Sequence, residues 1–341
     1  MEYVVIAYLW LSILLYVILG GADFGAGIIE LLTSAKNRIR TRKTLYHAIG
    51  PIWEANHMWL IIAIVILFVG FPVIYSEMST YLHIPLVIML VGIIARGTAF
   101  VFRHYDAIKD DMQWLYNRIF LLSSFVTPFF LGIIAASTIS GRIQPDATDF
   151  QTAYVFSWFN LFSIGVGLFT VSICGFLASI FLIGEADNDA DRTRFVNKAI
   201  RMNVAAIFCG IIVFILAEID KIPLRQWVFS DPVGLIAVQA ATISLAVLWF
   251  FIYRGKHMLP RIMAGFQVTM ILFAVSYAHF PDFIRLQGGQ SLSLLELQAP
   301  PKTMQALGWA LIIGSIFILP ALFYLYYSFQ RHEESPTKEG Y

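Results

Sequence analysis

Two carboxylates lie inside segments that are otherwise apolar enough to cross a membrane. Asp23 belongs to the stretch GGADFGAGIIE, residues 20–30, and Glu54 to the stretch GPIWEANHMWL, residues 50–60. An acidic side chain at membrane depth costs about 2.5–3.5 kcal/mol on the insertion scale, so it points to a function. The sequence therefore predicts that these two acids take part in proton transfer.

Arg96 is expected at the same depth as the two acids. With about 1.5 Å of rise per residue, Asp23 lies roughly 12 Å, Glu54 roughly 6–9 Å and Arg96 roughly 10 Å from the cytoplasmic end. We expect these groups on successive helices to come together, with Arg96 neutralising one carboxylate and leaving the other free to carry a proton. The alternative is structural: Asp23 in a buried ion pair with Arg96, and Glu54 serving only the helix end.

Glu30 and His57 extend this set through helical spacing. Asp23, Gly27 and Glu30 follow one another at i, i+4 and i+7, and Glu54 and His57 at i and i+3, so each group shares a helix face. Carboxylates, an imidazole and the waters they hold suit proton uptake from the cytoplasm. The alternative favoured for Glu30 is a solvated charge at the helix end. For His57 it is a hydrogen-bonded core histidine rather than a ligand.

Small and aromatic residues in the same stretches predict close contacts between helices. The small-xxx-small spacing from residue 21 to residue 25 lets another helix approach closely. Tryptophans at these positions are typical of packing or of a membrane interface. The residues assigned to helix packing or a partner interface are Gly20, Gly21, Gly25, Gly27, Trp53 and Trp59.

The composition sets the class of the protein. Of its 341 residues, 59% are apolar and 13% are charged, and the mean hydropathy is +0.74. A soluble domain does not hide this much apolar surface, and the runs lack the alternation of a membrane β-barrel. The sequence predicts an all-α polytopic membrane protein, and its net charge of +1 indicates no preference for nucleic acid.

Cofactor chemistry has little support in the residue types. Cys174 and Cys209 both lie in apolar segments, far apart, so they predict neither a disulfide nor a metal, cluster or dicopper site. The sequence contains no CxxCH motif for c-type haem. We therefore expect no metal in this chain and no cofactor bound directly by it.

Nine apolar runs predict nine transmembrane helices in one integral-membrane domain, residues 1–330. The predicted spans are 3–31, 50–75, 82–103, 115–138, 154–184, 200–218, 233–253, 261–281 and 305–328. Most of the 23 basic residues fall after odd-numbered spans, including a basic loop at 34–47. The positive-inside rule then places the N-terminus outside and the C-terminus inside. A polar tail, residues 331–341, is expected to be cytoplasmic and disordered.

Three blocks of sequence resemble one protein family. GGADFGAG at 20–27, PIWEANHMWL at 51–60 and ARGTAFVFR at 95–103 are similar to subunit II of the cytochrome bd-type quinol oxidases. The resemblance implies two four-helix bundles plus one peripheral helix. It also implies a bacterial or archaeal cytoplasmic-membrane complex that oxidises quinol at the outer side and reduces O₂ to water.

The same resemblance implies partners and roles. Haem b and haem d would be carried by the larger subunit I, with which this chain forms a heterodimer, and a small single-span accessory subunit can join them. Asp23 corresponds to the family's intramembrane carboxylate on a proton path, Glu54 to a second acid of that path, and Arg96 to the arginine of its third helix. Some members have Asp-Gly where this chain has Glu54-Ala55, so the longer side chain shifts the path by the length of a methylene group.

Two other functions use the same residue types. A proton-coupled secondary transporter also needs buried carboxylates near an arginine, but such proteins tend to place them near the midplane in paired repeats. Here the charges gather on one side, and no second half of the sequence mirrors them. The third hypothesis is a purely structural scaffold subunit, in which the acids only hold helices together. Co-purification with a haem-rich partner would indicate the oxidase, and activity of the chain alone the transporter.

Overall fold

The computed structural model describes residues 1–50, 52–105, 112–186 and 188–332. The first half holds α1 (Glu2–Leu15), the π-helical turn η1 (Tyr16–Gly20), α2 (Gly21–Leu31), α3 (Ala35–Ile49), α4 (Trp53–Gly70), α5 (Pro72–Tyr81), α6 (His83–Tyr105), α7 (Gln113–Ile139) and α8 (Phe150–Tyr154). The second half holds α9 (Leu161–Gly184), α10 (Asp189–Ile219), α11 (Leu224–Phe229), α12 (Pro232–Tyr253), α13 (Met258–His279), β1 (Asp282–Arg285), β2 (Ser291–Ser293) and α14 (Pro301–His332).

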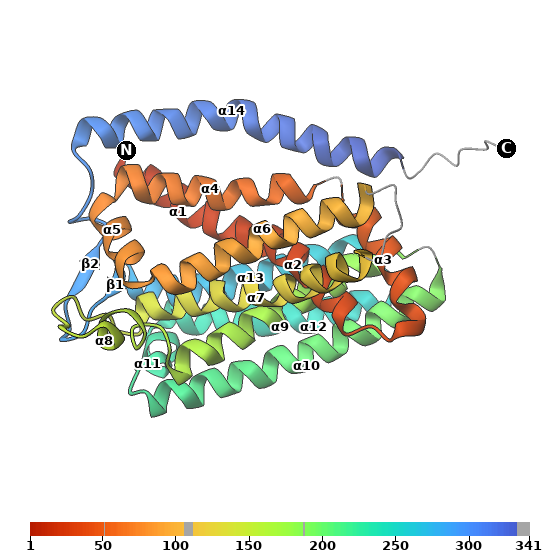
Figure 1. Cartoon of the computed structure of the whole chain (residues 1–341), viewed down its shortest axis with the longest axis horizontal. Coiled ribbons are helices and arrows are strands. Elements are labelled where there is room, and N and C mark those ends of the chain that lie inside the picture. The colour runs from red at the N-terminus through yellow and green to blue at the C-terminus, as the bar shows by residue number, and fades with distance from the viewer. Residues whose placement is uncertain (51, 106–111, 187, 333–341) are drawn as a thin grey trace.

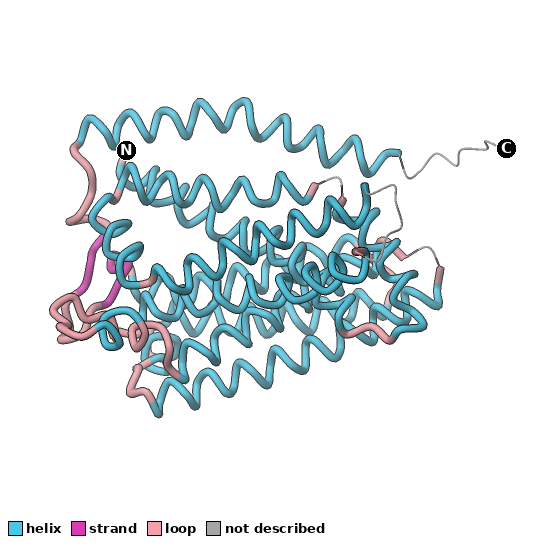
Figure 2. Tube along the Cα trace, viewed as in Figure 1, coloured by secondary structure: helices cyan, strands magenta, loops and turns pink. Residues whose placement is uncertain are grey.

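Long apolar helices dominate the molecule and run side by side (Figures 1 and 2). Within the described ranges, nine helical stretches are long and apolar enough to cross a membrane, which confirms the predicted all-α polytopic class. The first combines α1, η1 and α2, and the others are α4, α6, α7, α9, α10, α12, α13 and α14. The strands β1 and β2 mark one end of the molecule, called here the hairpin end, and α3 marks the opposite α3 end (Figure 1). The placement of the N-terminus outside stays a prediction.

Helix α9 lies at the centre and α14 at the edge. The most apolar window of α9 is 67% buried, whereas that of α14 is 11% buried. Helix α9 contacts α2, α7, α10 and α13. Among the described residues, α14 packs mainly against α1 and α4 (Figure 1). An almost fully exposed apolar helix can only be stable in lipid or against another chain. The two-bundle arrangement itself stays a prediction.

Glycines permit the central contact between α2 and α9. A Cβ atom added to Gly25 would collide with the backbone carbonyl of Cys174 and would lie 2.8 Å from the Cβ of Ala178, both on α9. A Cβ atom added to Gly21 would lie 3.3 Å from the Sγ atom of Cys174. The small-xxx-small pair therefore brings together two helices of this chain, and both glycines are buried there.

Three predicted spans have different bounds in the structure. The span predicted at 154–184 begins only at Leu161, because Asn160 accepts a hydrogen bond from the Ser163 amide and caps the helix. The span predicted at 50–75 ends at Gly70, because Phe71 leaves the helical conformation and Pro72 starts α5. The other bounds agree to about one turn, apart from α10 below.

Helix α10 is longer than the span predicted at 200–218. It begins at Asp189, where the side chain of Asn188 caps it by accepting from the Asp191 amide at 2.9 Å. Its first turns are polar, so hydropathy alone does not predict that they belong to the helix. These turns extend the helix beyond the apolar span at the α3 end.

The segment predicted as a basic loop at 34–47 is mostly helical. Residues Ala35–Ile49 form α3, which contains neither glycine nor proline, and Ser34 precedes it in an extended conformation. Thr41 and Leu45 are buried on its inner face, so contact with the bundle adds to the helical propensity. The polar tail predicted at 331–341 lies largely outside the described residues.

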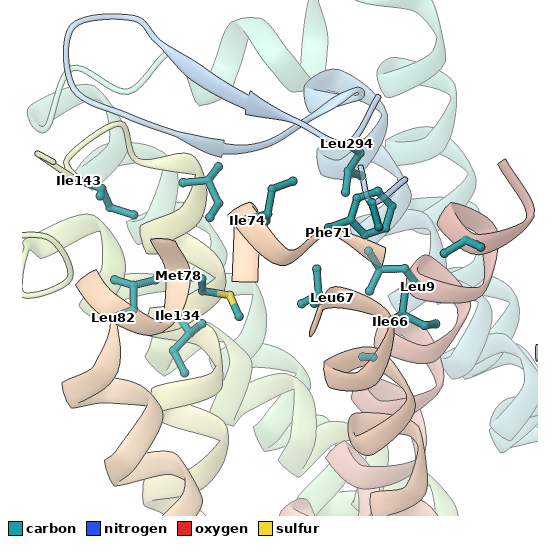
Figure 3. Packing of buried hydrophobic residues seen from close by; sticks show 14 of the residues in the cluster. Leu9, Ile66, Leu67, Phe71, Ile74, Met78, Leu82, Ile134, Ile143 and Leu294 are labelled. Carbon is teal, nitrogen blue, oxygen red and sulfur yellow. The ribbon is translucent and has the colours of Figure 1, made fainter. Parts of the chain in front are cut away.

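A hydrophobic cluster closes the hairpin end. Strands β1 and β2 pair antiparallel, and Leu294, directly after β2, belongs to the cluster that contains Phe71, Ile74 and Leu9 (Figure 3). The Ala299 amide donates a hydrogen bond to the carbonyl of Gly70 at 2.8 Å. The irregular end of α4 is thus bound to the segment after the hairpin.

The close contact at Gly25 predicts a specific cost of substitution. Gly25→Ala should destabilise the purified protein by about 1–3 kcal/mol, because overpacking against backbone cannot be relieved by side-chain rotation. The measurement is the thermal unfolding midpoint in detergent. Gly314→Ala on α14 is the matched control, since a Cβ there meets only a side-chain atom at 3.9 Å. Equal midpoints for the two variants would contradict the packing argument.

Candidate functional site

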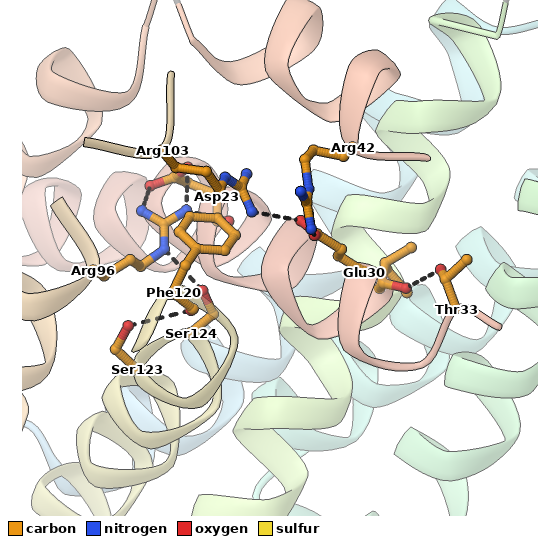
Figure 4. Close-up of polar contacts among 10 residues, drawn as sticks. Asp23, Glu30, Thr33, Arg42, Arg96, Arg103, Phe120, Ser123 and Ser124 are labelled. Carbon is orange, nitrogen blue, oxygen red and sulfur yellow. Dashed lines mark hydrogen bonds and ion pairs between the residues drawn. The ribbon is translucent and has the colours of Figure 1, made fainter. Parts of the chain in front are cut away.

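Asp23 and Arg96 form a buried bidentate ion pair between α2 and α6. Arg96 Nη1 donates to Asp23 Oδ2 at 2.6 Å and Nη2 donates to Oδ1 at 2.7 Å, and each residue is 1% exposed. Nη2 also donates to the Asp23 carbonyl at 2.8 Å, and Nε donates to Ser124 Oγ at 3.1 Å (Figure 4). Bidentate geometry of this kind is among the strongest charge-assisted interactions available to side chains.

The residues around this pair fit it closely. A Cβ on Gly27 would collide with the Ser124 hydroxyl, so glycine at this position leaves room for the serine that accepts from Arg96. The rings of Phe24 and Phe120 lie with centroids 5.3 and 5.0 Å from the Arg96 guanidinium carbon. These rings shield the pair from solvent and from lipid.

Glu30 forms a second buried ion pair, seven residues after Asp23. Arg103 Nη1 donates to Oε2 at 2.9 Å, and Arg42 Nε donates to Oε1 at 2.9 Å (Figure 4). Glu30 is 0% exposed, so the expectation of a solvated helix-end charge is wrong. The reason is α3, which folds back over the end of α2 and brings Arg42 to the carboxylate.

The two ion pairs are in register. Asp23 and Glu30 are seven residues apart on α2, and Arg96 and Arg103 are seven residues apart on α6. Both helices run toward the α3 end, and seven residues correspond to about 10.5 Å along each axis (Figure 1). Phe120 of α7 lies between the two arginines, with its centroid 4.1 Å from Arg103. We call this arrangement the two-rung ladder.

Lys198 contacts the end of the same helix. Its Nζ donates to the carbonyl of Ile29 at 3.0 Å and to the hydroxyl of Thr33, which itself donates to Ile29. The carbonyls at a helix C-terminus attract cations because they lack partners within the helix. Lys198 of α10 thus satisfies the end of α2 where α3 begins.

His57 lies beside Asp23 without bonding to it. Its Nε2 is 3.8 Å from Asp23 Oδ2, which is longer than a hydrogen bond. The imidazole is surrounded by the rings of Tyr16, Phe24 and Trp53, at centroid distances of 6.0, 5.6 and 6.3 Å. The side chain is 15% exposed, so it lies at the edge of the buried region.

Glu54 is placed differently from the other acids. It is the second residue of α4, its side chain is exposed, and it makes no hydrogen bond or ion pair with the residues that the structure describes. The structure brings Asp23, Arg96 and His57 together but leaves Glu54 on the outer face of α4. Glu54 lies three residues before His57 on α4, so about one helical turn separates the two residues along the helix axis.

The remaining predicted packing residues lie around the same site. Trp59 is 7% exposed and packs with Tyr16 and Phe24. Trp53 lies over Gly97, where an added Cβ would be 3.1 Å from its ring. Gly20 faces the ring of Tyr16 within its own helix. Within the described ranges, no group of three or more His, Cys, Asp or Glu side chains is arranged to hold a metal ion.

Sequence reasoning missed several residues of the site, and one signal could have found some of them. From the sequence, Arg42, Arg103 and Lys198 are predicted only as positive charges at the cytoplasmic side. One pattern in the sequence predicts the second ion pair. The two acids of the first span and the two arginines of the third span have the same spacing, and parallel helices align residues at equal intervals. Tyr16 and Ser124 carry no comparable pattern.

The second rung yields a prediction about stability. Glu30→Gln leaves Arg103 buried without its counter-charge, so we expect a loss of about 3–5 kcal/mol in the free energy of unfolding. The control is Glu218→Gln, because Glu218 and Arg225 are exposed and such surface pairs contribute about 0–1 kcal/mol. Thermal unfolding in detergent compares the two. A Glu30 variant as stable as the control would show that the rung does not hold the helices.

Comparison with known proteins agrees with this geometry. Residues 1–329 match the family described as Cytochrome bd terminal oxidase subunit II. Cytochrome bd ubiquinol oxidase subunit 2 of Bacillus subtilis (strain 168) is 24% identical, over 94% of this chain and 94% of the relative. The putative cytochrome bd menaquinol oxidase subunit II of the same strain is 22% identical, over 98% of this chain and 97% of that relative.

A solved structure has the same fold. The structure of bd oxidase from Geobacillus thermodenitrificans contains a chain that matches at a TM-score of 0.68 and 19% identity, covering 94% of this chain and 98% of that chain. The resemblance expected from the three sequence blocks is therefore confirmed over nearly the whole length. The chain belongs to the cytochrome bd terminal oxidase subunit II family, whose members are multi-pass membrane subunits of an oxidoreductase complex.

Proposed function

We propose that this chain supplies protons from the cytoplasm for the reduction of O₂ to water in a bd-type quinol oxidase. We further propose that it scaffolds the haem-bearing subunit I. Reduction of O₂ to water consumes protons, and a site buried in the membrane needs a polar route to obtain them. The observation that carries the proposal is that His57 lies beside the buried Asp23–Arg96 pair and next to the Phe24 ring, with Glu54 three residues before it on α4.

The roles within this route follow from the partners of each group. Both oxygens of Asp23 accept from Arg96, and both oxygens of Glu30 accept from arginines, so these two acids are engaged. Glu54 is the acid left without a partner among the described residues, which suits a group that gains and loses protons. His57 approaches Asp23 to 3.8 Å, follows Glu54 by three residues on α4, and can take up a proton at one ring nitrogen and release one at the other.

Glu54 also supports the scaffold role. A carboxylate exposed at the side of an apolar helix is costly against lipid, so we infer that this face of α4 meets subunit I. The exposed apolar side chains Ile61 and Phe68 continue the same helix toward the hairpin end. The route would then pass from the boundary between the subunits to the ladder.

The haems implied by the family fit subunit I better than this chain. Two imidazoles of the described spans lie against aromatic rings: His57 is beside three of them, and the buried His279 packs against Trp227, with its Nδ1 bonded to the Val275 carbonyl. A histidine that ligates haem iron needs space for the porphyrin beside one free ring nitrogen. We therefore propose that haem b and haem d are bound by the partner and that quinol is a substrate of the whole complex.

A purely structural role is the competing proposal. Satisfied ion pairs such as those of Asp23 and Glu30 are also what a scaffold would use. The hypothesis of a proton-coupled transporter loses support, because the chain belongs to an oxidase subunit family. Glu54 separates the two remaining proposals, because no ion pair between described residues depends on it.

The proton route predicts that Glu54→Gln slows catalysis without loss of assembly. We expect quinol-driven O₂ consumption by the purified complex to fall about tenfold, equivalent to about 1.4 kcal/mol of barrier, because the amide cannot carry a proton. Haem content on the same sample should stay normal. Glu2→Gln is the matched control, an exposed acid in the first turn of α1. Normal turnover of the Glu54 variant would favour the scaffold.

A further inference from the structure

A π-helical turn interrupts the first span just before Asp23. Residues Tyr16–Gly20 form this turn between α1 and α2. Turns of this kind are rare and are often found at functional sites. Gly20 has a steric reason to be glycine, since an added Cβ would lie 3.0 Å from two ring atoms of Tyr16.

The turn and Gly20 together direct the Tyr16 side chain along the helix. The ring passes over residue 20 and meets Phe24 edge-on, with 6.2 Å between centroids. Tyr16 is 2% exposed. Its hydroxyl therefore lies within the buried region beside the helical turn that holds Asp23.

Two buried polar atoms in this region have no hydrogen-bond partner among the described residues. They are Tyr16 Oη and His57 Nδ1, whose rings are 6.0 Å apart between centroids. Leaving a buried polar group unsatisfied costs about 1–3 kcal/mol, and two such groups on neighbouring rings call for a shared partner. Buried waters typically make about three hydrogen bonds to groups of this kind.

We propose that a single buried water binds between Tyr16 Oη and His57 Nδ1, and that Tyr16 is a positioning residue for it. Water can donate to or accept from either atom, so it satisfies both tautomers of His57. The rings of Phe24 and Trp53 beside the imidazole exclude further solvent. As far as it concerns proton transfer, this inference rests on the proposed function.

The water gives His57 a proton source at Nδ1, whereas Nε2 is the ring nitrogen that approaches Asp23. Nε2 faces Asp23 at 3.8 Å, so Nδ1 faces the proposed water. A proton taken up at Nδ1 from the water allows the imidazole to release one at Nε2 toward Asp23. In the proposed route the water regains its proton from Glu54, which is reprotonated from the cytoplasm, so no other reactant is needed.

The site itself is tested by a map of the assembled complex at a resolution that shows ordered water. We expect a density peak at hydrogen-bond distance, about 2.7–3.2 Å, from both Tyr16 Oη and His57 Nδ1. A map of that quality without the peak, or with the two side chains bonded directly, would overturn the proposal.

The role of Tyr16 is tested by Tyr16→Phe in the purified complex. We expect kcat for quinol oxidation to fall about fivefold or more, with the quinol KM and the haem spectrum unchanged. Tyr8→Phe is the control, since Tyr8 lies on the same span and its hydroxyl bonds Ser315 of α14 instead. An unchanged kcat, or a loss of haem with Tyr16→Phe, would overturn the positioning role.

The comparison with Glu54→Gln separates this inference from the proposed function. If Glu54→Gln slows turnover and Tyr16→Phe does not, the water site is wrong and the uptake route stands. If neither variant slows turnover, the uptake route itself fails.

Discussion

The bidentate ion pair between Asp23 and Arg96 is the interaction on which the site depends. A buried pair of opposite charges adds little net stability compared with apolar contacts, but removal of one partner is strongly destabilising. Such a pair therefore fixes which residues face each other. Here it sets the register of α2 against α6, and the same register brings Glu30 to Arg103. The two-rung ladder thus holds the first and third spans at one relative height.

Other elements are arranged around the ladder. Helix α7 supplies Phe120 between the arginines and Ser124 to Arg96, and it approaches α2 closely at Gly27. Helix α3 closes the ladder at its end through Arg42. Both rungs are ion pairs, whereas His57 and Glu54 have no ion-pair partner at hydrogen-bond distance among the described residues and lie beside the ladder, so the proposed route reaches the ladder at Asp23. Such a division suits the proposed function, in which one part of the site holds the helices and the groups beside it carry protons.

Much of this could be predicted from the sequence. Apolar runs predict the spans because length and hydropathy decide membrane insertion, and a lone arginine at the depth of Asp23 has few other partners. The burial of Glu30 could not be predicted, since it depends on how α3 folds back, which no periodicity encodes. The exposure of Glu54 could not be predicted either, because α4 begins only at Trp53, one residue before it. Tyr16 depends on a π-turn, for which its sequence gives no pattern.

The central claim is that the Asp23–Arg96 pair serves proton transfer and not assembly alone. The most direct measurement compares quinol-driven O₂ consumption and haem content for Asp23→Asn with those for the double variant Asp23→Asn/Arg96→Gln. The double variant leaves no unpaired charge, so the account predicts normal haem content with turnover lowered about tenfold or more. Haem content and turnover both near normal in the double variant would contradict it, because the pair would then be only a structural link.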